Sequence, residues 1–540
     1  MFAQEEGSMK KGEERTFSTK SPDVEWDYVV IGSGMGGLTS ATILSQFGKR
    51  VLVLEQHYEP GGFTHTFKRK RWRWDVGVHA VGEVHPKAIL GRFLRKMSRG
   101  SLEWTNLGSV YDEFYFPGLR IDFPDSLAQF RTNLLEKFPE EQAAIDEYLR
   151  LVHVCSDKIR PYYLSRVLPE KFARVVDRTI TRQANELLTK STESVLKKIT
   201  TSDRLRTVLT AQWGYYGVEP ARSSFAMHAL VAKHFERGGF YPKGGSQRIA
   251  QTLMATIAAS GGWTRIRAEV DQIVVENGEV KGVDLKGGER IRAKRVVSAA
   301  GALATVNHLL PESERKKPWA QSIARLKPSP CHLCLYIGFK GDIRKAGAGS
   351  ANKWFYEVWG SDTMYWNVED ETSEAPVLYT SFPSLKDPEH DPGPEELHTG
   401  EVVTFVPYDV FAKWRDARWQ KRGKDYASFK KDIEERMLAQ FLKHMPELKD
   451  KVAYVELSTP LSTEHFTRAT AGAIYGIEPT PERYLTPHLR PRTPVKGLFL
   501  SGSDMASVGV MGAMIGGLLA AASAEPLGAV NYIREMVAGR

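Results

Sequence analysis

The chain has 540 residues, of which 42% are hydrophobic and 26% charged, a composition of globular proteins at a length that predicts more than one domain. Lys and Arg outnumber Asp and Glu by 74 to 65, a surplus that favours contact with anionic surfaces without selecting one. Only three cysteines are present, which excludes a disulfide-rich secreted scaffold and favours a reducing, cytoplasmic compartment.

The amino-terminal segment, before Trp26, carries acidic residues and lacks an apolar core. It therefore does not match a secretory signal, and we expect a mobile arm. The stretch WDYVVI follows, from Trp26 to Ile31, and is apolar enough for a strand inside a parallel sheet.

A glycine-rich loop comes after this strand and before a helical pattern. Gly32, Gly34 and Gly37 have the GxGxxG spacing, and Gly36 lies inside it. In such a loop the first glycine permits a tight turn, the second lets the backbone approach a pyrophosphate, and the third lets helix and strand touch. Because the amino terminus of the helix then faces the phosphates, the motif predicts dinucleotide binding.

The residues after this helix distinguish between two possible dinucleotides, FAD and NAD. A second apolar strand, RVLVLE, ends at Glu55, whose carboxylate suits the hydroxyls of an unphosphorylated ribose. The pair Gly61 and Gly62 then lets the chain run close to a second stretch of cofactor. A small nicotinamide domain seldom needs that second stretch, so we expect FAD rather than NAD.

Bases, aromatic residues and titratable groups are combined in the next segment. KRKRWRW, from Lys68 to Trp74, alternates as a strand does, and one basic run lacks the broad footprint of a nucleic-acid binder, so we expect no nucleic-acid partner. His79 and Glu83 follow in DVGVHAVGE and are candidate proton donors beside a flavin. A hydrogen-bonded core histidine fits the same pattern.

The chain from about Pro86 to Phe240 is helical in pattern, with many bases and apolar residues. Amphipathic helices of this kind can rest on a membrane surface, or they can be ordinary solvated faces. Peripheral contact with the cytoplasmic face of a membrane therefore stays an open hypothesis.

Two later segments predict strands. AEVDQIVVENGEVKGVDLKGGERIRAKRVVSAAG alternates around Asn277-Gly278 and Gly287-Gly288, as a small antiparallel sheet would. CHLCLYIGFKG also reads as a strand, and no second ligand pair follows Cys331 and Cys334 at zinc spacing. We therefore expect buried thiols rather than a redox pair, and no metal site.

The carboxyl-terminal block GLFLSGSDMASVGVMGAMIGG repeats the order of strand, glycine turn and helix. Asp504, after Gly502, can bind hydroxyls of a ribityl chain, and the helix start near Gly509 or Val510 can approach a flavin ring. The uncharged run from Met505 to Ala524 nearly reaches membrane-spanning length. Its glycine and alanine content makes it weakly hydrophobic, so a packed helix is favoured over a membrane span.

Six blocks in unchanged order, from about Trp26 to Ala524, resemble the phytoene desaturase superfamily of FAD enzymes, and within it the retinol saturase branch. They are VVIGSGMGGLTSA, VLVLEQHYEPGGFTHTF, WDVGVHAVGEV, FYPKGGSQRIA, AIYGIEPTPERY and LFLSGSDMASVGVMGA. The resemblance implies an α/β fold, with a two-dinucleotide-binding-type, Rossmann-like FAD domain and an inserted substrate domain of mixed sheet and helices. We place the FAD domain at 24–95, 240–301 and 496–540, and the substrate domain at 96–239 and 302–495.

The resemblance also implies roles for matching residues. The pyrophosphate would lie at Gly32, Gly34 and Gly37, the adenosine ribose at Glu55, the stretch toward the isoalloxazine at Gly61 and Gly62, the adenine edge at Val270 and the ribityl side at Asp504. Phe63 stands where amine oxidases commonly carry arginine after the glycine pair, which weakens the hypothesis of amine oxidation.

The expected reaction is the saturation of a carbon–carbon double bond in a long hydrophobic polyene, retinoid, carotenoid-like or polyunsaturated lipid. Cis-trans isomerisation and desaturation are the rival reactions, and a flavin-bound lipid carrier without turnover is the hypothesis from another class. Saturation needs a proton donor, and Tyr475 in GAIYGIEP joins His79 and Glu83 as a candidate. No second nicotinamide fingerprint is evident, so we expect a separate electron donor.

Overall fold

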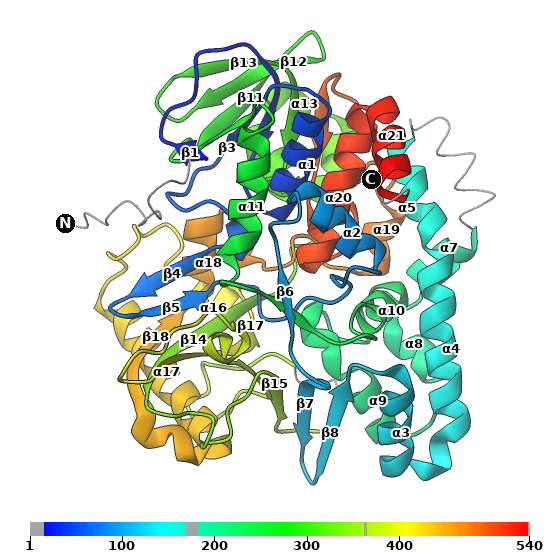
Figure 1. Ribbon diagram of the computed structural model, residues 1–540, viewed down its shortest axis with the longest axis vertical. Helices are drawn as coiled ribbons and strands as arrows, with labels where there is room; N and C mark the ends of the chain where they lie inside the picture. Colours follow the sequence, from blue (N-terminus) through cyan, green and yellow to red (C-terminus); the bar gives the residue numbers. More distant parts are fainter. Residues whose placement is uncertain (1–15, 169–181, 361–363, 538–540) are drawn as a thin grey trace.

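Two β-sheets organise the protein, one in the upper and one in the lower half of Figure 1. The computed structural model describes residues 16–168, 182–360 and 364–537. Most of the predicted amino-terminal arm, residues 1–15, lies outside the described residues.

Among the described residues the first sheet has eight strands, which come from the two ends and the middle of the chain. Its order is β1 (Phe17–Ser18), β10 (Trp263–Arg265), β3 (Val51–Leu54), β2 (Trp26–Ile31), β13 (Arg290–Ser298), β12 (Glu279–Leu285) and β11 (Val270–Glu276), and β19 (Leu498–Leu500) also pairs with β13. The pairs from β1 to β13 and the pair β13–β19 are parallel. The ladder β11–β12–β13 is antiparallel, which confirms the predicted small sheet.

Three helices pack beside the parallel strands. They are α1 (Met35–Gln46), α11 (Gln247–Ala258) and α20 (Gly509–Ala524), and α1 lies between the other two. The uncharged run from Met505 to Ala524 is therefore mostly the packed helix α20, as expected. None of the helices in the described ranges is long and apolar enough to cross a membrane.

The described part of the second sheet has seven strands in the order β18 (Val452–Ser458), β14 (Cys331–Lys340), β17 (Leu397–Val406), β16 (Val377–Ser381), β15 (Asn352–Tyr356), β7 (Val110–Phe116) and β8 (Leu119–Pro124). One face packs on α17 (Lys424–His444) through the alternate residues Leu335 and Ile337 of β14. The strand predicted at Cys331 is confirmed, and all three cysteines are free and buried.

A hairpin links the two halves. The predicted strand at Lys68–Trp74 is observed as β4 (Thr66–Arg69) and β5 (Trp72–Asp75). The indole nitrogens of Trp72 and Trp74 donate to the carbonyl oxygens of Phe339 and Ile337, both at 3.1 Å. This part of the predicted FAD domain thus lies against the second sheet, and the division into domains stays a prediction.

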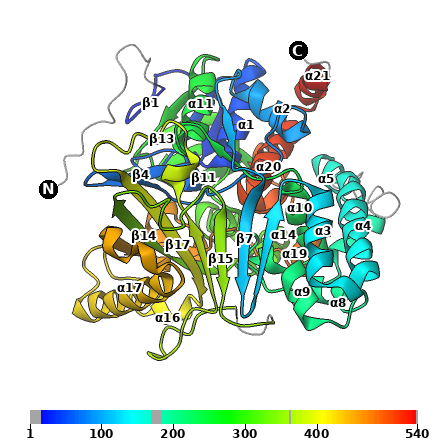
Figure 2. The same ribbon diagram turned by 60° about the horizontal axis from the view of Figure 1, so that its bottom comes forward.

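The segment from Pro86 to Phe240 is only partly helical, so the prediction of helices throughout was wrong for residues 110–124. There VYDEFYF and LRIDFP form the hairpin β7–β8, because aromatic and β-branched residues alternate around Pro117-Gly118. The helices gather on the right in Figure 2: α3 (Leu127–Lys137), α4 (Gln142–Lys158), α5 (Arg160–Val167), α7 (Arg182–Leu188), α8 (Thr192–Leu196), α9 (Asp203–Leu209) and α10 (Phe225–His234).

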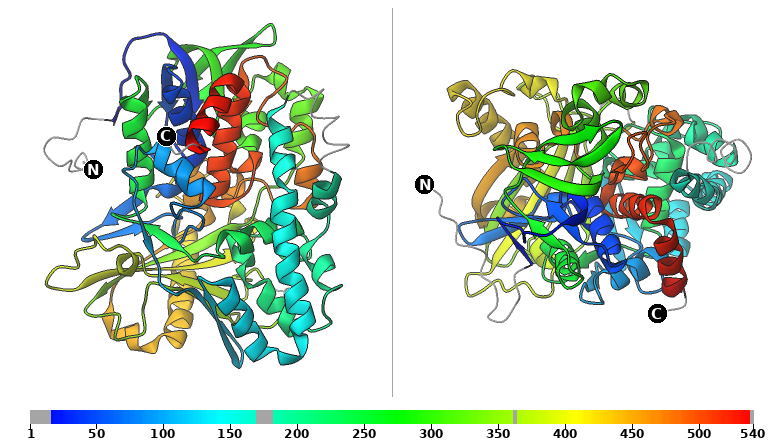
Figure 3. Two further views of the ribbon diagram at one scale, coloured as in Figure 1. Left: turned by 45° about the vertical axis from the view of Figure 1, so that its right-hand side comes forward. Right: turned by 90° about the horizontal axis from the view of Figure 1, so that it is seen from above.

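Shorter elements and the last helix, α21, complete the described fold, which Figure 3 shows from two further sides. They are α2 (Ile89–Met97), β6 (Trp104–Asn106), β9 (Phe240–Pro242), α12 (Ala302–Ala304), α13 (Glu312–Arg315), α14 (Pro318–Ala324), α15 (Pro383–Lys386), α16 (Asp409–Ala412), α18 (Pro460–Thr467), α19 (Pro481–Leu485) and α21 (Pro526–Val537).

Candidate active site

A cavity of about 980 Å³ begins where four parallel strands of the first sheet end. Its walls there are Gly32, Gly34 and Gly36 after β2, Glu55 after β3, Ala299, Ala300 and Gly301 after β13, and Ser501, Gly502, Ser503 and Asp504 after β19. Ligands of open α/β sheets bind at this edge, because the loops there can diverge around them.

The glycines of the first loop divide into two groups. Gly34 has an extended backbone, and a Cβ atom there would meet nothing within 4 Å, because the position faces the cavity. A Cβ at Gly36 would lie 2.4 Å from Cα of Gly502, and one at Gly37 would lie 2.0 Å from the carbonyl oxygen of Gly32. Gly34 can therefore admit a ligand beside it, whereas Gly36 and Gly37 lack a side chain so that neighbouring backbone can pack against them.

Two helices begin at the cavity. Neither the N-cap residue of α1, Gly34, nor that of α20, Val508, makes a capping hydrogen bond with its side chain, and neither helix has an acidic residue in its first turn. Gly509 and Val510, at the start of α20, line the cavity. Backbone N–H groups and the positive ends of two helix dipoles thus suit a pyrophosphate and the electron-rich edge of a flavin.

The Glu55 carboxylate is buried at the end of β3. Its Oε2 accepts from the backbone nitrogen of Ser33 at 2.9 Å and the hydroxyl of Ser33 at 2.6 Å, and its Oε1 accepts from the nitrogen of His57 at 2.7 Å. A carboxylate has about four acceptor positions, so capacity remains toward the cavity that Glu55 lines. Ser33 was not predicted as a site residue, although its place inside the glycine loop is a usable signal.

Asp504 joins three loops at the other end of the cofactor region. Its Oδ2 accepts from the nitrogen of Ala302 at 2.7 Å, and its Oδ1 accepts from the nitrogen of Ile477 at 2.8 Å. Gly502 and Val270 also line the cavity, and so does Gly62; Gly37 and Gly61 do not. The structure thus brings most of the predicted cofactor residues to one cavity, and their individual roles stay predictions.

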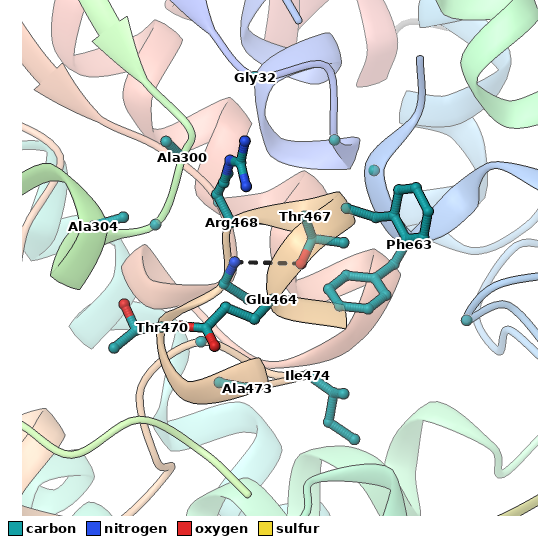
Figure 4. Close-up of a pocket in the computed structure, with 18 of the residues that line it drawn as sticks. Gly32, Phe63, Ala300, Ala304, Glu464, Thr467, Arg468, Thr470, Ala473 and Ile474 are labelled. Atoms are coloured by element: carbon teal, nitrogen blue, oxygen red, sulfur yellow. Dashed lines mark hydrogen bonds between the residues drawn. The ribbon is translucent and has the colours of Figure 1, made fainter. Parts of the chain in front are cut away.

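Arg468 is a basic residue of this region that the sequence patterns did not single out. It follows α18, and in Figure 4 its side chain extends toward the space between Gly32 and Ala300. The guanidinium is held by Glu269, with the shorter contact at 3.1 Å from Nε to Oε1. It therefore places a positive charge near the glycine-rich loop after β2.

The other end of the cavity is formed by aromatic side chains. They are Tyr215, Trp354, Tyr379, Phe405 and Tyr475, and Phe63 also lines the cavity. The rings of Trp354 and Tyr379 pack edge to face with centroids 4.5 Å apart. Flat, apolar walls of this kind suit a conjugated hydrocarbon chain.

Two of the three predicted proton donors line this end. His79 lies beside Tyr379, with ring centroids 5.2 Å apart, and burial lowers the pKa of His79 to about 3. The hydroxyl of Tyr475 donates to the carbonyl oxygen of Gly214 at 3.0 Å, and burial raises its pKa. Glu83 does not line the cavity. His79, a neutral imidazole in the wall of the cavity, is the best placed of the three.

A second cavity, of about 630 Å³, shares nine lining residues with the first, among them Phe63, His65, His332 and Arg422. Its lining includes the bases Arg69, Arg422, Lys424 and Lys430 and the acid Glu456. A ligand that extended past Phe63 would therefore meet positive charge.

Comparisons with known proteins agree with this geometry. The family model for flavin containing amine oxidoreductase matches residues 35–524. All-trans-retinol 13,14-reductase of Danio rerio is 33% identical over 516 residues, which cover 91% of this chain and 84% of the relative. The chloroplastic prolycopene isomerase of Daucus carota is 24% identical, and the match covers 92% of this chain and 79% of the relative.

Among solved structures, an oxidoreductase from Methanosarcina mazei matches with a TM-score of 0.60 and 18% identity. The match covers 91% of this chain and 98% of that one. This likeness supports the fold, a largely parallel first sheet with a second sheet beside it.

Proposed function

Because this chain belongs to the family of flavin containing amine oxidoreductases, we propose that it is an FAD-dependent enzyme that saturates a carbon–carbon double bond in a long hydrophobic polyene. One observation carries the proposal: a single cavity runs from the glycine-rich loops to a wall of aromatic rings that includes the partly buried His79. The similarity to a retinol reductase over nearly the whole chain supports the same substrate class.

The residues around the cavity fit FAD, whose two halves need two binding regions. Glu55 is placed for the adenosine ribose and the start of α1 for the pyrophosphate, with Arg468 as a further positive charge. Asp504 and the start of α20 are placed for the ribityl chain and the flavin ring. When bound and reduced, the flavin supplies hydride to one carbon of the double bond.

The chain's own groups would do the rest. Trp354, Tyr379 and Phe405 would hold the polyene flat and keep water out, because their side chains are buried around the inner end of the cavity. His79 would give a proton to the carbon that takes no hydride. A separate electron donor must reduce the flavin between turnovers.

Isomerisation of a polyene is the second candidate, and the similarity to a prolycopene isomerase supports it. It needs the same aromatic walls but no net proton. Desaturation would run the redox step in the opposite direction, and a lipid carrier would bind the polyene without changing it. Amine oxidation is the least supported, because Phe63 replaces the arginine expected after the glycine pair.

An anaerobic experiment separates these functions. The purified flavoprotein is reduced, and retinoids, carotenoids and polyunsaturated lipids are added while flavin absorbance and product mass are followed together. Saturation predicts reoxidised flavin and a product heavier by two hydrogens. A changed isomer of unchanged mass with flavin still reduced identifies an isomerase, and bound but unchanged polyene under oxidising and reducing conditions identifies a carrier.

We also propose peripheral membrane contact, through exposed apolar side chains on three helices. Leu164 of α5 is 67% exposed and Leu527 of α21 is 84% exposed, and Ile89 of α2 is also exposed. Contact of α2 with α21 places part of this apolar surface together. Co-sedimentation with vesicles of anionic phospholipid tests this, with Leu527→Asp expected to reduce the bound fraction and unaltered binding by the variant contradicting it.

A further inference from the structure

Several buried titratable groups lie behind the wall of the cavity that His79 forms. Glu401, at the start of the run EVVTFV in β17, has a side chain that is 0% exposed. Side chains alternate along a strand, so Glu401 shares a face with Val403 and Phe405, which line the cavity. Burying a carboxyl group in this apolar strand costs folding free energy unless the group has a partner.

That partner is His79. Its Nδ1 lies 2.8 Å from Oε2 of Glu401, an ion-pair contact whose angles are not those of a hydrogen bond, and neither atom has a hydrogen-bond partner among the described residues. The second oxygen, Oε1, accepts from the backbone nitrogen of Asp75 at 2.8 Å, which anchors the carboxyl group. Because Nδ1 and Oε2 both have lone pairs, contact at this distance needs one proton between them. The other ring nitrogen, Nε2, is then left for the cavity.

Lys386 places a positive charge beside the pair. Its Nζ donates to the carbonyl oxygen of His79 at 2.7 Å, to the hydroxyl of Ser381 at 2.8 Å and to Asn352. Ser381 is the residue directly opposite Glu401 in the pairing of β16 with β17. All three hydrogens of the ammonium group are therefore engaged, and its position relative to Glu401 is fixed from two sides.

The protonation states are compatible with a proton held at rest on the pair. Burial raises the pKa of Glu401 to about 8, although the charge of Lys386 works against this rise. Burial and the same lysine lower the pKa of His79 to about 3. At neutral pH the pair is then a carboxylic acid beside a neutral imidazole, an arrangement that can release a proton without first burying a charge.

We propose, on the basis of the function proposed above, that Glu401 is the proton reserve of His79 and that Lys386 is a positioning residue for the resulting carboxylate. Addition of hydride to one carbon of the polyene leaves an electron pair on its neighbour. That carbon takes the proton from Nε2 of His79, forming a C–H bond, while Nδ1 takes the proton of Glu401. The net change is one proton moved from Glu401 to the substrate, and one proton from solvent later restores the acid.

Other titratable groups surround the pair and affect its pH dependence. They are Asp75, Asp112, Tyr215, Tyr241, His332, Cys334, Tyr336 and Tyr379, besides Lys386. Asp75 is held by the hydroxyls of Tyr241 and Ser246, both at 2.5 Å, and its pKa is raised to about 6 by burial and by Glu401. At pH 7 Asp75 is therefore still a carboxylate, and two groups lose protons as the pH rises to about 8: Glu401, and Lys386, whose pKa burial lowers to about 8.

The test compares the holoprotein with Glu401→Gln, Glu401→Asp and the matched control Glu357→Gln. Glu357 also contacts a histidine, His444 at 2.5 Å, but it does not line the cavity. We expect Glu401→Gln to slow polyene-dependent flavin reoxidation about 100-fold and to remove the loss of rate above about pH 8, while Glu401→Asp restores part of both. Glu357→Gln should change neither. Unaltered rate and pH profile in Glu401→Gln would overturn the proposal.

A second readout needs no turnover. The infrared spectrum of the resting holoprotein should contain a protonated carboxyl band that shifts in D₂O and is missing in Glu401→Gln but present in Glu357→Gln. Lys386→Met should make the carboxylate of Glu401 harder to form, so this band should persist to higher pH than in the parent protein. Absence of the band at neutral pH would refute the proton reserve. Its presence in a protein that saturates no polyene would instead refute the proposed function while the reserve remains.

Discussion

Gly36 and Gly502 are in backbone contact: a Cβ atom on Gly36 would lie 2.4 Å from Cα of Gly502. One glycine is in the first turn of α1, after β2, and the other is in the turn after β19. The hydroxyl of Ser501 also donates to the carbonyl oxygen of Gly36 at 3.0 Å. The two glycine-rich blocks, one near each end of the chain, thus form one continuous wall of the cavity.

The variant Gly36→Ala should therefore be less stable, by about 1–3 kcal/mol, because the new methyl group overpacks this contact. A loss of stability would be informative, because alanine inside a helix is otherwise more stable than glycine by about 1 kcal/mol. Chemical denaturation would measure the loss. Gly349→Ala is the control, because a Cβ atom there meets nothing within 4 Å. Equal stability of the two variants would contradict the inferred contact.

Gly34→Val should abolish flavin binding while the protein stays folded. The valine side chain would enter the cavity and block the approach of the pyrophosphate to the backbone. The expected result is a colourless protein with an almost unchanged melting temperature. Gly349→Val has similar space for its side chain and should remain yellow. If Gly34→Val purified with a full complement of flavin, the phosphate assignment would be wrong.

His79→Asn should keep the flavin but slow the reaction of the reduced protein with its polyene by about 100- to 10,000-fold, the usual contribution of a general acid. Stopped-flow absorbance under anaerobic conditions measures this step directly. His153 is a suitable control, since it does not line the cavity, and His153→Asn should leave the rate unchanged. An undiminished rate in His79→Asn would return His79 to the class of structural core histidines.

The free energy of unfolding should depend on pH through Glu401. Its pKa is about 8 in the folded protein and 4.5 as an unperturbed group. Between pH 4.5 and pH 8, Glu401 is therefore protonated in the folded state and ionised in the unfolded state. The contribution to stability is therefore present below about pH 4.5 and is lost as pH rises to about 8, by roughly 3–5 kcal/mol. Denaturation of the parent protein and Glu401→Gln at pH 5 and pH 8 measures the difference. A parent-minus-variant difference that does not fall with pH would contradict the assignment.

The cofactor half of the site could be predicted because its signals are local. The GxGxxG loop, Glu55, the glycine pair and the Gly502–Val510 block each lie at the end of one apolar strand or the start of one helix. The carboxyl ends of parallel strands share one edge of a sheet, so the order of the elements already implies that these residues meet.

The catalytic half could be predicted only in part. His79 was singled out from its own segment, but Glu401 comes from β17 and Lys386 from the short helix α15, both more than 300 residues later. The one signal for Glu401 was an acid within an apolar strand, HTGEVVTFV, which does not name its partner. The strands within residues 110–124 were missed for a related reason. The strand β7 pairs with β15, which lies far along the chain, and the sequence of β7 by itself is only a weak signal for a strand.

The sequence by itself thus determined the class of protein and the cofactor loops, because local strand, turn and helix patterns encode them, and its resemblance to a known family implied a hydrophobic ligand. Only the tertiary structure decided which titratable group faces the cavity and which one stands behind it. The packing of β5, which precedes His79, on β17 brings His79 and Glu401 to 2.8 Å. Burial in that contact, rather than the identity of either residue, sets where their protons lie.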